Sequence, residues 1–366
     1  MPQASLINNI ALTLVPGVGP VTAKSLISYC GGASEVFKAK KKKLLQVPGV
    51  GEGMAESILN FKSFARAEKE LAFAEQHEIQ CITFTDTRYP KRLRNCIDAP
   101  ILLYYKGNAD LNAAKVIGVV GTRKATAYGK HLCDEIVRAL HPYDVLIVSG
   151  MAYGIDIAAH KACMKHEVAT VGVLGHGLDR LYPEIHRDVA KKMIAHGGLL
   201  TEYISGTNPD RENFPQRNRI VAGMIDGLVV VETDTEGGSM ITASLAYNYN
   251  RDVMAVPGNV DNKNSRGCNY LIKNNRASLI ENGADIVSLM NWELKTQKAK
   301  TQRELFIELS KEEKMVCDIL LQKGELHIDE LMSCLPFTPG TLAGLLLNLE
   351  FQGVVVSLAG KRYKTA

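Results

Sequence analysis

The sequence is short of several features that define large classes of protein. It holds one tryptophan, its net charge is only +4, and its eight cysteines include no Cys-x-x-Cys pair. No apolar run approaches the roughly 20 residues that a membrane-spanning helix needs, and the first residues lack the basic and apolar regions of a secretory signal. We therefore expect a cytoplasmic protein with no membrane, metal, redox or disulfide chemistry, whose cysteines are reduced and mostly buried.

What is present is typical of a globular chain. The 366 residues are 46% hydrophobic and 22% charged. A chain of this length is expected to form about two or three domains. The weak positive charge is compatible with an acidic partner but does not require one. The local distribution of cations must therefore show whether the chain binds a polyanion.

Short apolar runs recur between residues 115 and 257, each followed by a glycine turn and a helical pattern. Such runs are typical of strands buried on both faces of a parallel sheet, and their alternation with helices indicates βαβ units. The expected strands lie at residues 115–121, 146–150, 169–175, 199–202, 228–232 and 253–257. We predict an α/β fold with an extended Rossmann-like, doubly wound parallel sheet. Ligands bind such sheets outside the carboxyl ends of the strands.

The turns at that edge hold glycines, cations and one aromatic residue. In the first turn Arg123 and Lys124 stand where a dinucleotide-binding turn needs glycines, which excludes the ordinary NAD site. Later turns contain Gly154, His176 and Phe214. This composition suits an anionic ligand with a flat part that can stack.

The N-terminal segment repeats one motif. Val-Pro-Gly-Val-Gly occurs at residues 15–19 and again at 47–51, each time before a short helical pattern. The two copies resemble tandem helix-hairpin-helix motifs, whose exposed N–H groups can bind phosphate. Glu52 and Glu56 make the second copy a poor phosphate site. Whether this domain contacts nucleic acid or only packs its helices stays open.

Residues 311–366 predict three helices followed by a short β pair, the pattern of a winged helix. Its third helix, at 338–350, is mainly apolar and carries Glu350, so an interaction or regulatory role is as good a prediction as DNA reading. We predict four segments: a helix-hairpin-helix domain (1–67), the core (68–290), a partly helical linker (291–310) and the winged helix (311–366). Within the core, residues 68–107 are expected to pack on the edge of the main sheet.

Several motifs in one order carry a family resemblance. They include Gly-Thr-Arg at 121–123, Ser-Gly-Met-Ala-Tyr-Gly-Ile-Asp at 149–156, Phe-Pro-Gln-Arg-Asn-Arg at 214–219, Gly-Ser at 238–239 and Ala-Val-Pro-Gly at 255–258. On these motifs the chain resembles the bacterial DprA/Smf family (DNA-processing protein A). The resemblance implies sequence-independent binding and protection of single-stranded DNA in natural transformation and recombination, without catalysis or a cofactor. It also implies a homodimer that loads the RecA recombinase and relieves the block imposed by single-stranded DNA-binding protein.

The resemblance also implies which residues contact DNA. Cations follow the phosphates of a single strand and aromatic side chains stack on its bases, so Arg123 and Arg211 are the expected phosphate contacts and Phe214 the stacking residue. The helix N-terminus after 228–232 offers a further phosphate site. The full expected set is Arg123, Lys124, Gly154, His176, Arg211, Phe214, Arg217, Asn218, Arg219, Gly237, Gly238 and Ser239.

Some residues of this set are also expected to have structural roles. At least one residue of 217–219 is expected to pack inward and hold the loop. Arg123 has a structural alternative, an ion pair with Asp156 or Glu232. His176 stands where the family typically has a small residue, and we interpret it as a tolerated variant.

The main alternative is an enzyme. The core also resembles nucleoside-monophosphate phosphoribohydrolases, which carry a Pro-Gly-Gly-x-Gly-Thr-x-x-Glu turn where this chain has residues 236–244. The last position is Ser244, so the glutamate that the chemistry needs is missing, and Glu202 or Glu232 would have to replace it. A second alternative is an interaction scaffold that contacts DNA only through its end domains, which the cationic turns of the core argue against.

Overall fold

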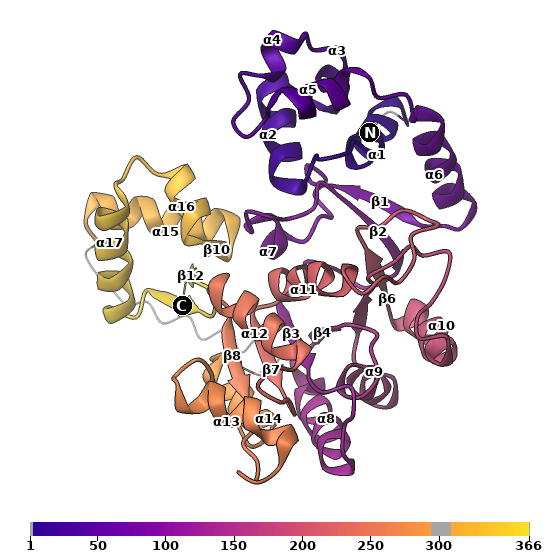
Figure 1. Cartoon of the computed structure of the whole chain (residues 1–366). Coiled ribbons are helices and arrows are strands. Elements are labelled where there is room, and N and C mark those ends of the chain that lie inside the picture. The colour runs from indigo at the N-terminus through magenta and orange to yellow at the C-terminus, as the bar shows by residue number, and fades with distance from the viewer. Residues whose placement is uncertain (1–2, 294–308, 366) are drawn as a thin grey trace.

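The computed structural model describes residues 3–293 and 309–365, and within them a central sheet carries helices on both faces (Figure 1). Its strand order is β1-β2-β6-β5-β4-β3-β7-β8-β9. The strands from β6 to β9 along this order are parallel, whereas β2 pairs antiparallel with β6 and β1 with β2. The strands are β1 (Gln80–Thr83), β2 (Leu102–Gly107), β3 (Lys115–Val120), β4 (Val145–Ser149), β5 (Thr170–Val173), β6 (Gly197–Thr201), β7 (Gly227–Val230), β8 (Asp252–Ala255) and β9 (Ser278–Leu279).

This sheet confirms the predicted fold class and all six predicted strands. The inner strands are buried along their length, as runs covered on both faces must be. The edge position predicted for residues 68–107 is also confirmed, because β1 and β2 extend the sheet beyond β6.

The helices form two layers. One face is covered by α7 (Lys91–Arg94), α11 (Asn213–Met224), α12 (Gly238–Asn248) and α13 (Arg266–Lys273). The other is covered by α8 (Ala127–Leu140), α9 (Ile155–Lys165) and α14 (Gly283–Leu289), with α10 (Arg187–His196) beside them. Short 3-10 turns occur at His141–Tyr143, Glu184–His186 and Lys263–Ser265.

The N-terminal helices pack on the antiparallel end of the sheet. Their apolar side chains share one cluster with Ile101, Leu102 and Tyr104 of the β2 region. The predicted boundary at residue 67 falls within α6. Glu52 and Glu56 both form ion pairs with Lys41, at 2.6 and 3.0 Å, so these acidic residues neutralise one of the four consecutive lysines at residues 40–43. The helices are α1 (Gln3–Thr13), α2 (Pro20–Cys30), α3 (Ala33–Lys38), α4 (Lys41–Leu44), α5 (Glu52–Leu59) and α6 (Phe64–Gln76).

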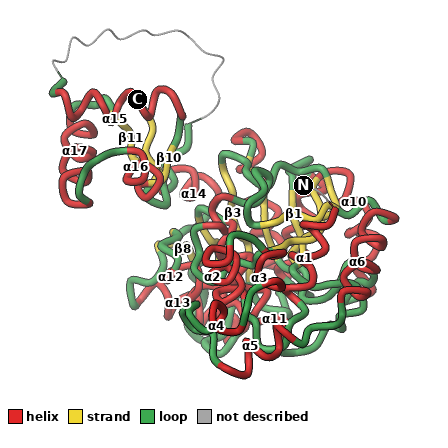
Figure 2. The backbone as a smooth tube through the Cα atoms, turned by 90° about the horizontal axis from the view of Figure 1, so that it is seen from above, coloured by secondary structure: helices red, strands yellow, loops and turns green. Residues whose placement is uncertain are grey.

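The C-terminal unit stands to one side of the core (Figure 2). Its predicted helices and β pair are confirmed, and a third short strand, β10, joins them in the order β10-β12-β11. Most of the predicted linker, residues 294–308, lies outside the described residues. The elements are α15 (Lys311–Lys323), β10 (Leu326–His327), α16 (Ile328–Cys334), α17 (Pro339–Phe351), β11 (Val355–Leu358) and β12 (Arg362–Thr365).

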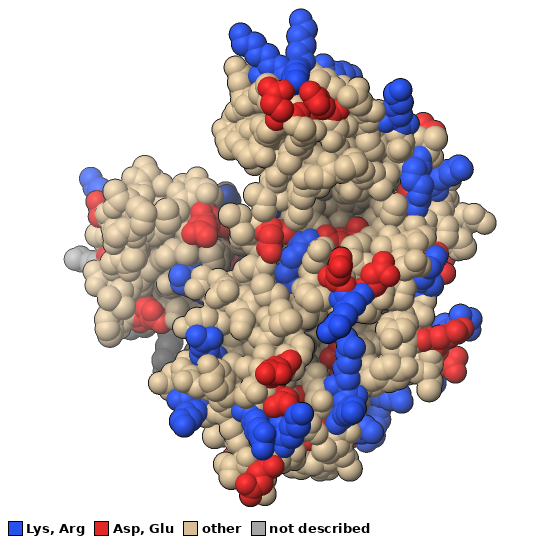
Figure 3. Space-filling view, viewed as in Figure 1, with Lys and Arg blue, Asp and Glu red and all other residues tan. Residues whose placement is uncertain are grey.

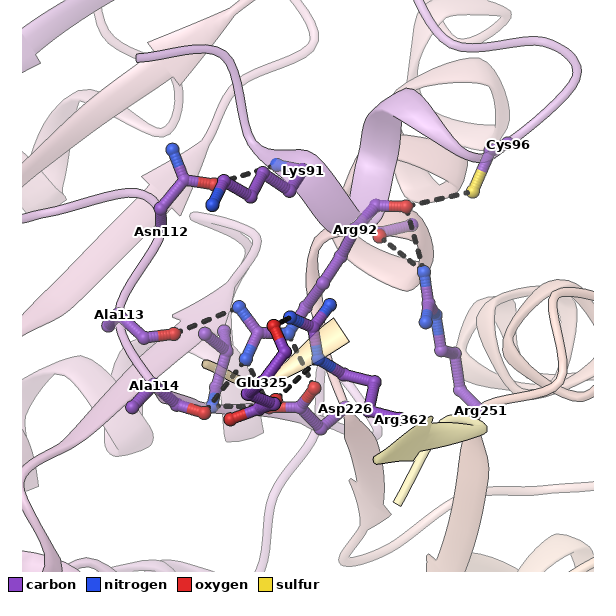
Figure 4. A network of polar contacts seen from close by, with 12 residues as sticks. Lys91, Arg92, Cys96, Asn112, Ala113, Ala114, Asp226, Arg251, Glu325 and Arg362 are labelled. Carbon is purple, nitrogen blue, oxygen red and sulfur yellow. Dashed lines mark hydrogen bonds and ion pairs between the residues drawn. The ribbon is translucent and has the colours of Figure 1, made fainter. Parts of the chain in front are cut away.

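A buried ion pair joins α7 to the start of the parallel sheet (Figure 4). The Asp226 carboxylate, just before β7, accepts from Arg92 Nε at 2.5 Å and Nη2 at 2.8 Å, and from the Val116 N–H at 2.9 Å. The Arg92 guanidinium also donates to the carbonyls of Ala113 and Ala114, each at 2.9 Å. Both charged side chains are only 7% exposed. The pair therefore connects three segments that are distant in the sequence.

Six of the eight cysteines are buried, which confirms that they are mostly buried. Burial raises the pKa of the Cys163 thiol to about 12 and so disfavours its reactive thiolate. As for membrane spans, the described residues contain no single helix long and apolar enough to cross a bilayer; the bent pair α16 and α17 passes that test by length and composition only.

Candidate functional site

The turns after β3, β4 and β5 meet the first turn of α11 around one cavity of about 80 Å³. It lies at the carboxyl ends of the parallel strands, the edge where the sequence predicted a site. Arg123 comes from the first turn, Tyr153 from the second, His176 and Tyr182 from the third, and Phe214 from α11. The cavity therefore lies on the side of β3 where β4 and β5 are, and not on the side of β7. The strand order reverses between β3 and β7.

Arg123 and Phe214 lie together at this cavity. Arg123 is exposed, and the central carbon of its guanidinium is 5.6 Å from the centroid of the Phe214 ring. The Phe214 ring in turn lies 6.0 Å from the ring of Tyr182. Among the described residues Arg123 makes no ion pair with Asp156 or Glu232, although its positive charge acts to lower the pKa of Asp156. Glu232 instead accepts from the backbone and hydroxyl of Thr126, at 2.9 and 2.6 Å.

Phe214 requires one correction. It was expected in a loop before a helix, but α11 begins at Asn213 and places Phe214 in its first turn. Pro215 is compatible with this position because its missing N–H would have no partner in the first turn. The ring is therefore anchored on a helix, which limits how far it moves.

Arg217 and Arg219 pack inward, as was expected for at least one residue of this segment. Arg217 is 5% exposed and donates to the Val173 carbonyl. Arg219 is 9% exposed and donates to Glu202 and to the Asp98 carbonyl. Both thus hold α11 against the sheet. Arg217 also lines the cavity, and its buried Nε has no hydrogen-bond partner within the described part of the chain.

His176 supports the wall of the cavity. Its side chain is 1% exposed, and both ring nitrogens are engaged. Nδ1–H donates to the Gly177 carbonyl at 2.9 Å, and Nε2 accepts from the Tyr182 N–H at 3.1 Å. Burial lowers the pKa of His176, which favours this neutral form. The histidine holds the segment that presents Tyr182.

Two glycines let the turns approach one another. Gly154 has a φ of +81°, and a Cβ there would lie 2.0 Å from the Thr122 carbonyl oxygen. A Cβ on Gly150 would lie 2.3 Å from an Arg217 nitrogen and 2.4 Å from an Asp156 oxygen. Burial raises the pKa of Asp156 to about 6, opposed by the positive charge of Arg217. Gly154, from the expected contact set, therefore has a clear structural task.

The other expected contacts do not line the cavity. Lys124 and Arg211 are exposed, and Asn218 is half-buried. The segment 237–239 follows β7, on the other side of β3. There the Gly237 N–H donates to the Asp234 carbonyl at 3.0 Å and the Ser239 hydroxyl to Thr233 at 2.6 Å, while Gly238 is exposed. Among the described residues no group of three His, Cys, Asp or Glu side chains suits a metal ion.

Two tyrosines at the cavity were not singled out from the sequence. Tyr153 is 48% exposed and Tyr182 is 46% exposed. The available signal was an aromatic residue within a turn, next to Gly154 in one case and Pro183 in the other. A large ring left in water beside an exposed cation is a reason to include both in the site.

His160 beneath the cavity predicts a pH dependence of stability. It is fully buried, its Nε2–H donates to the Gly150 carbonyl at 2.6 Å, and its Nδ1 lies 2.8 Å from the Thr170 hydroxyl oxygen. Burial lowers its pKa from 6.5 to about 4. Because the folded state disfavours the imidazolium, this contribution is fully present above pH 6.5 and is lost as pH falls towards 4. The shift corresponds to about 3 kcal/mol.

Urea unfolding between pH 4 and 7.5, followed by the fluorescence of the single tryptophan, Trp292, measures this effect. The wild type should lose stability on acidification more steeply than His160→Gln, and His131→Gln, at an exposed position of α8, should follow the wild type. Parallel curves for the wild type and His160→Gln would show that the ring is not held neutral.

Comparisons with known proteins place these features in a family. Residues 80–291 match the family described as DNA recombination-mediator protein A, residues 10–61 a SAM-like helix-hairpin-helix tandem, and residues 303–361 the DprA winged helix domain. A putative DNA processing protein DprA from Mycobacterium tuberculosis is 35% identical over 85% of this chain and 84% of its own length. DNA processing protein DprA from Streptococcus pneumoniae is 32% identical over 69% of this chain and 96% of its own length.

Two solved structures of DNA processing protein A are similar in fold to this chain. The X-ray structure of the Streptococcus pneumoniae protein superposes with a TM-score of 0.67 and 30% identity, covering 78% of this chain and 98% of that one. A structure of DNA processing protein A from Helicobacter pylori, described by its single-stranded DNA binding mode, gives 0.54 and 27%, covering 59% and 98%.

Proposed function

We propose, from the premise that this chain belongs to the family of DNA recombination-mediator protein A, that it binds and protects single-stranded DNA without reading its sequence. The observation that carries the proposal is the exposed Arg123 guanidinium lying beside the Phe214 ring at the carboxyl edge of the sheet. A single strand presents phosphates to such a cation and unstacked bases to such a ring, and neither contact depends on the base. The DNA binding described for the Helicobacter pylori relative supports the same interpretation.

The exposed contacts divide by role. Arg123, Lys124 and Arg211 contact phosphates, and Phe214 stacks on a base, with Tyr182 beside it. The buried members of the expected set act indirectly: Arg217, Arg219 and His176 hold the loops that present these side chains. Gly238 offers a further N–H at the start of α12, on the other side of β3.

Family membership alone supports the wider part of the proposal. The chain acts in natural transformation and recombination as a cytoplasmic homodimer. It loads RecA onto single-stranded DNA and relieves the block imposed by single-stranded DNA-binding protein. It does so without catalysis. Ser244 occupies the position where a phosphoribohydrolase turn needs glutamate, Glu202 is bound to Arg219, and Glu232 to Thr126.

Direct binding tests this function. A fluorescent oligothymidylate and a duplex of the same length are titrated with the full chain across a salt series. We expect tighter binding of the single strand, and a log–log salt slope of about −2 if three phosphates are neutralised, at about −0.7 each. Equal binding of the duplex would contradict the proposal. Absence of binding, together with release of ribose 5-phosphate from nucleoside monophosphates, would favour the hydrolase alternative.

A further inference from the structure

A second depression, of about 480 Å³, lies between α8 and α9. Lys130 and Asp134 of α8 form one side of it, and Lys161 and Lys165 of α9 the other. Ala158 and Ala162, four residues apart and so on one face of α9, form its floor. Small side chains between two rows of long cationic ones leave a groove that a chain of phosphates can enter.

The charges of this groove are mostly uncompensated. Lys124, Lys130 and Lys161 are exposed, and in the described ranges no carboxylate lies within ion-pair distance of any of them. The groove contains one carboxylate, Asp134, which pairs with Lys165 at 2.8 Å. In Figure 3, Lys and Arg side chains, with some Asp and Glu side chains between them, lie over the lower part of the core, where Figure 1 places α8 and α9. Unpaired cations in a row attract a polyanion.

The groove is continuous with the cavity. Arg123 and Tyr153 line both. The Tyr153 ring is 48% exposed and lies 5.2 Å from the ring of His186, which is itself fixed by a bond to the Met151 carbonyl at 2.9 Å. A strand whose base stacks at Phe214 can therefore pass Tyr153 and enter the groove without leaving the surface.

We propose that the groove between α8 and α9 carries the sugar–phosphate backbone of single-stranded DNA beyond the cavity. Lys124, Lys130 and Lys161 neutralise successive phosphates, Tyr153 marks the entrance, and Asp134 marks the far end. This inference rests on the proposed function and extends it, because it gives the bound strand a direction across the surface and a footprint longer than the cavity alone.

The test compares oligothymidylates of about 4 and about 16 nucleotides, the range of single-strand site sizes. The variant Lys130→Gln/Lys161→Gln should bind the short strand like the wild type. It should bind the long strand roughly tenfold more weakly at low salt, with a salt slope shallower by about 1.4, since each phosphate contact contributes about 0.7. The matched control, Lys62→Gln/Lys69→Gln, removes two exposed lysines at and before α6 and should change neither length.

A variant that removes a negative charge from the groove distinguishes a loss of phosphate contacts from a loss of folding. Asp134→Asn removes the carboxylate that lines the groove and frees Lys165 from its ion pair. The long strand should therefore bind more tightly, and the affinity for the short strand should not change. Equal affinity of the double-lysine variant and the wild type for the long strand would overturn the groove and leave the proposed function intact. Equal losses at both lengths, or the same loss in the control, would overturn it too. If the wild type binds neither length, the proposed function itself fails.

Discussion

Replacing Arg123 and Phe214 together by alanine should lower the affinity for single-stranded DNA by at least about a hundredfold. Removing a stacking ring costs about 1–3 kcal/mol per base, which is roughly 5- to 150-fold, and removing Arg123 deletes a phosphate contact as well. The two side chains touch, with the guanidinium 5.6 Å from the ring centroid, so their effects should not be additive. The salt slope should become shallower, because one cation is lost.

Fluorescence anisotropy of the double variant and both single variants, in the same salt series as the wild type, measures these effects. Arg88→Ala/Tyr29→Ala is a matched control, since it removes an exposed cation and an exposed ring outside the cavity. The single variant Phe214→Ala should weaken binding with little change in salt slope, because no charge is lost. Unchanged affinity in the double variant would move the DNA site to the helix-hairpin-helix or winged-helix unit.

The place of this site was predictable because topology fixes it. Apolar runs such as Val145–Ser149 become strands buried on both faces, and parallel strands deliver every following turn to one edge. Arg123 and Phe214, distant in the sequence, therefore had to lie at the same edge. The extent of the cavity was not predictable, because it depends on which turns pack closely enough to close it, as at Gly154.

Which side chains face outward was harder to predict. Arg217 and Arg219 are both buried because backbone carbonyls and the Glu202 carboxylate accept hydrogen bonds from them, and those partners come from other segments. The role of His176 depends on a backbone N–H, that of Tyr182, which no pattern of side chains reveals. Similarly, the spacing of Lys161 and Lys165 indicates one face of a helix, but the neighbouring Lys130 is known only from the packing of α8 on α9.

The largest loss of stability is expected from Arg92→Met. Among the described residues, this change leaves the buried Asp226 carboxylate with the Val116 N–H as its one remaining hydrogen-bond donor, and the Arg251 cation interacts with it without a hydrogen bond. Breaking a buried ion pair by removing one partner costs about 3–5 kcal/mol. Urea unfolding followed by Trp292 fluorescence measures the cost, because Trp292 packs against the core. Arg88→Met is the matched control: its ion pair with Asp86 is 56% exposed on the arginine side, and such pairs contribute about 0–1 kcal/mol.

A second substitution distinguishes the ion pair from simple packing. Arg92→Met/Asp226→Leu removes both charges, so it should recover part of the stability that Arg92→Met loses. Recovery should stay incomplete, because the carbonyls of Ala113 and Ala114 and the N–H of Val116 lose their partners. A double variant less stable than Arg92→Met would instead show that the contacts of Asp226 with the backbone outweigh its charge. The pair would then act mainly as a hydrogen-bonded clamp between α7 and the parallel sheet.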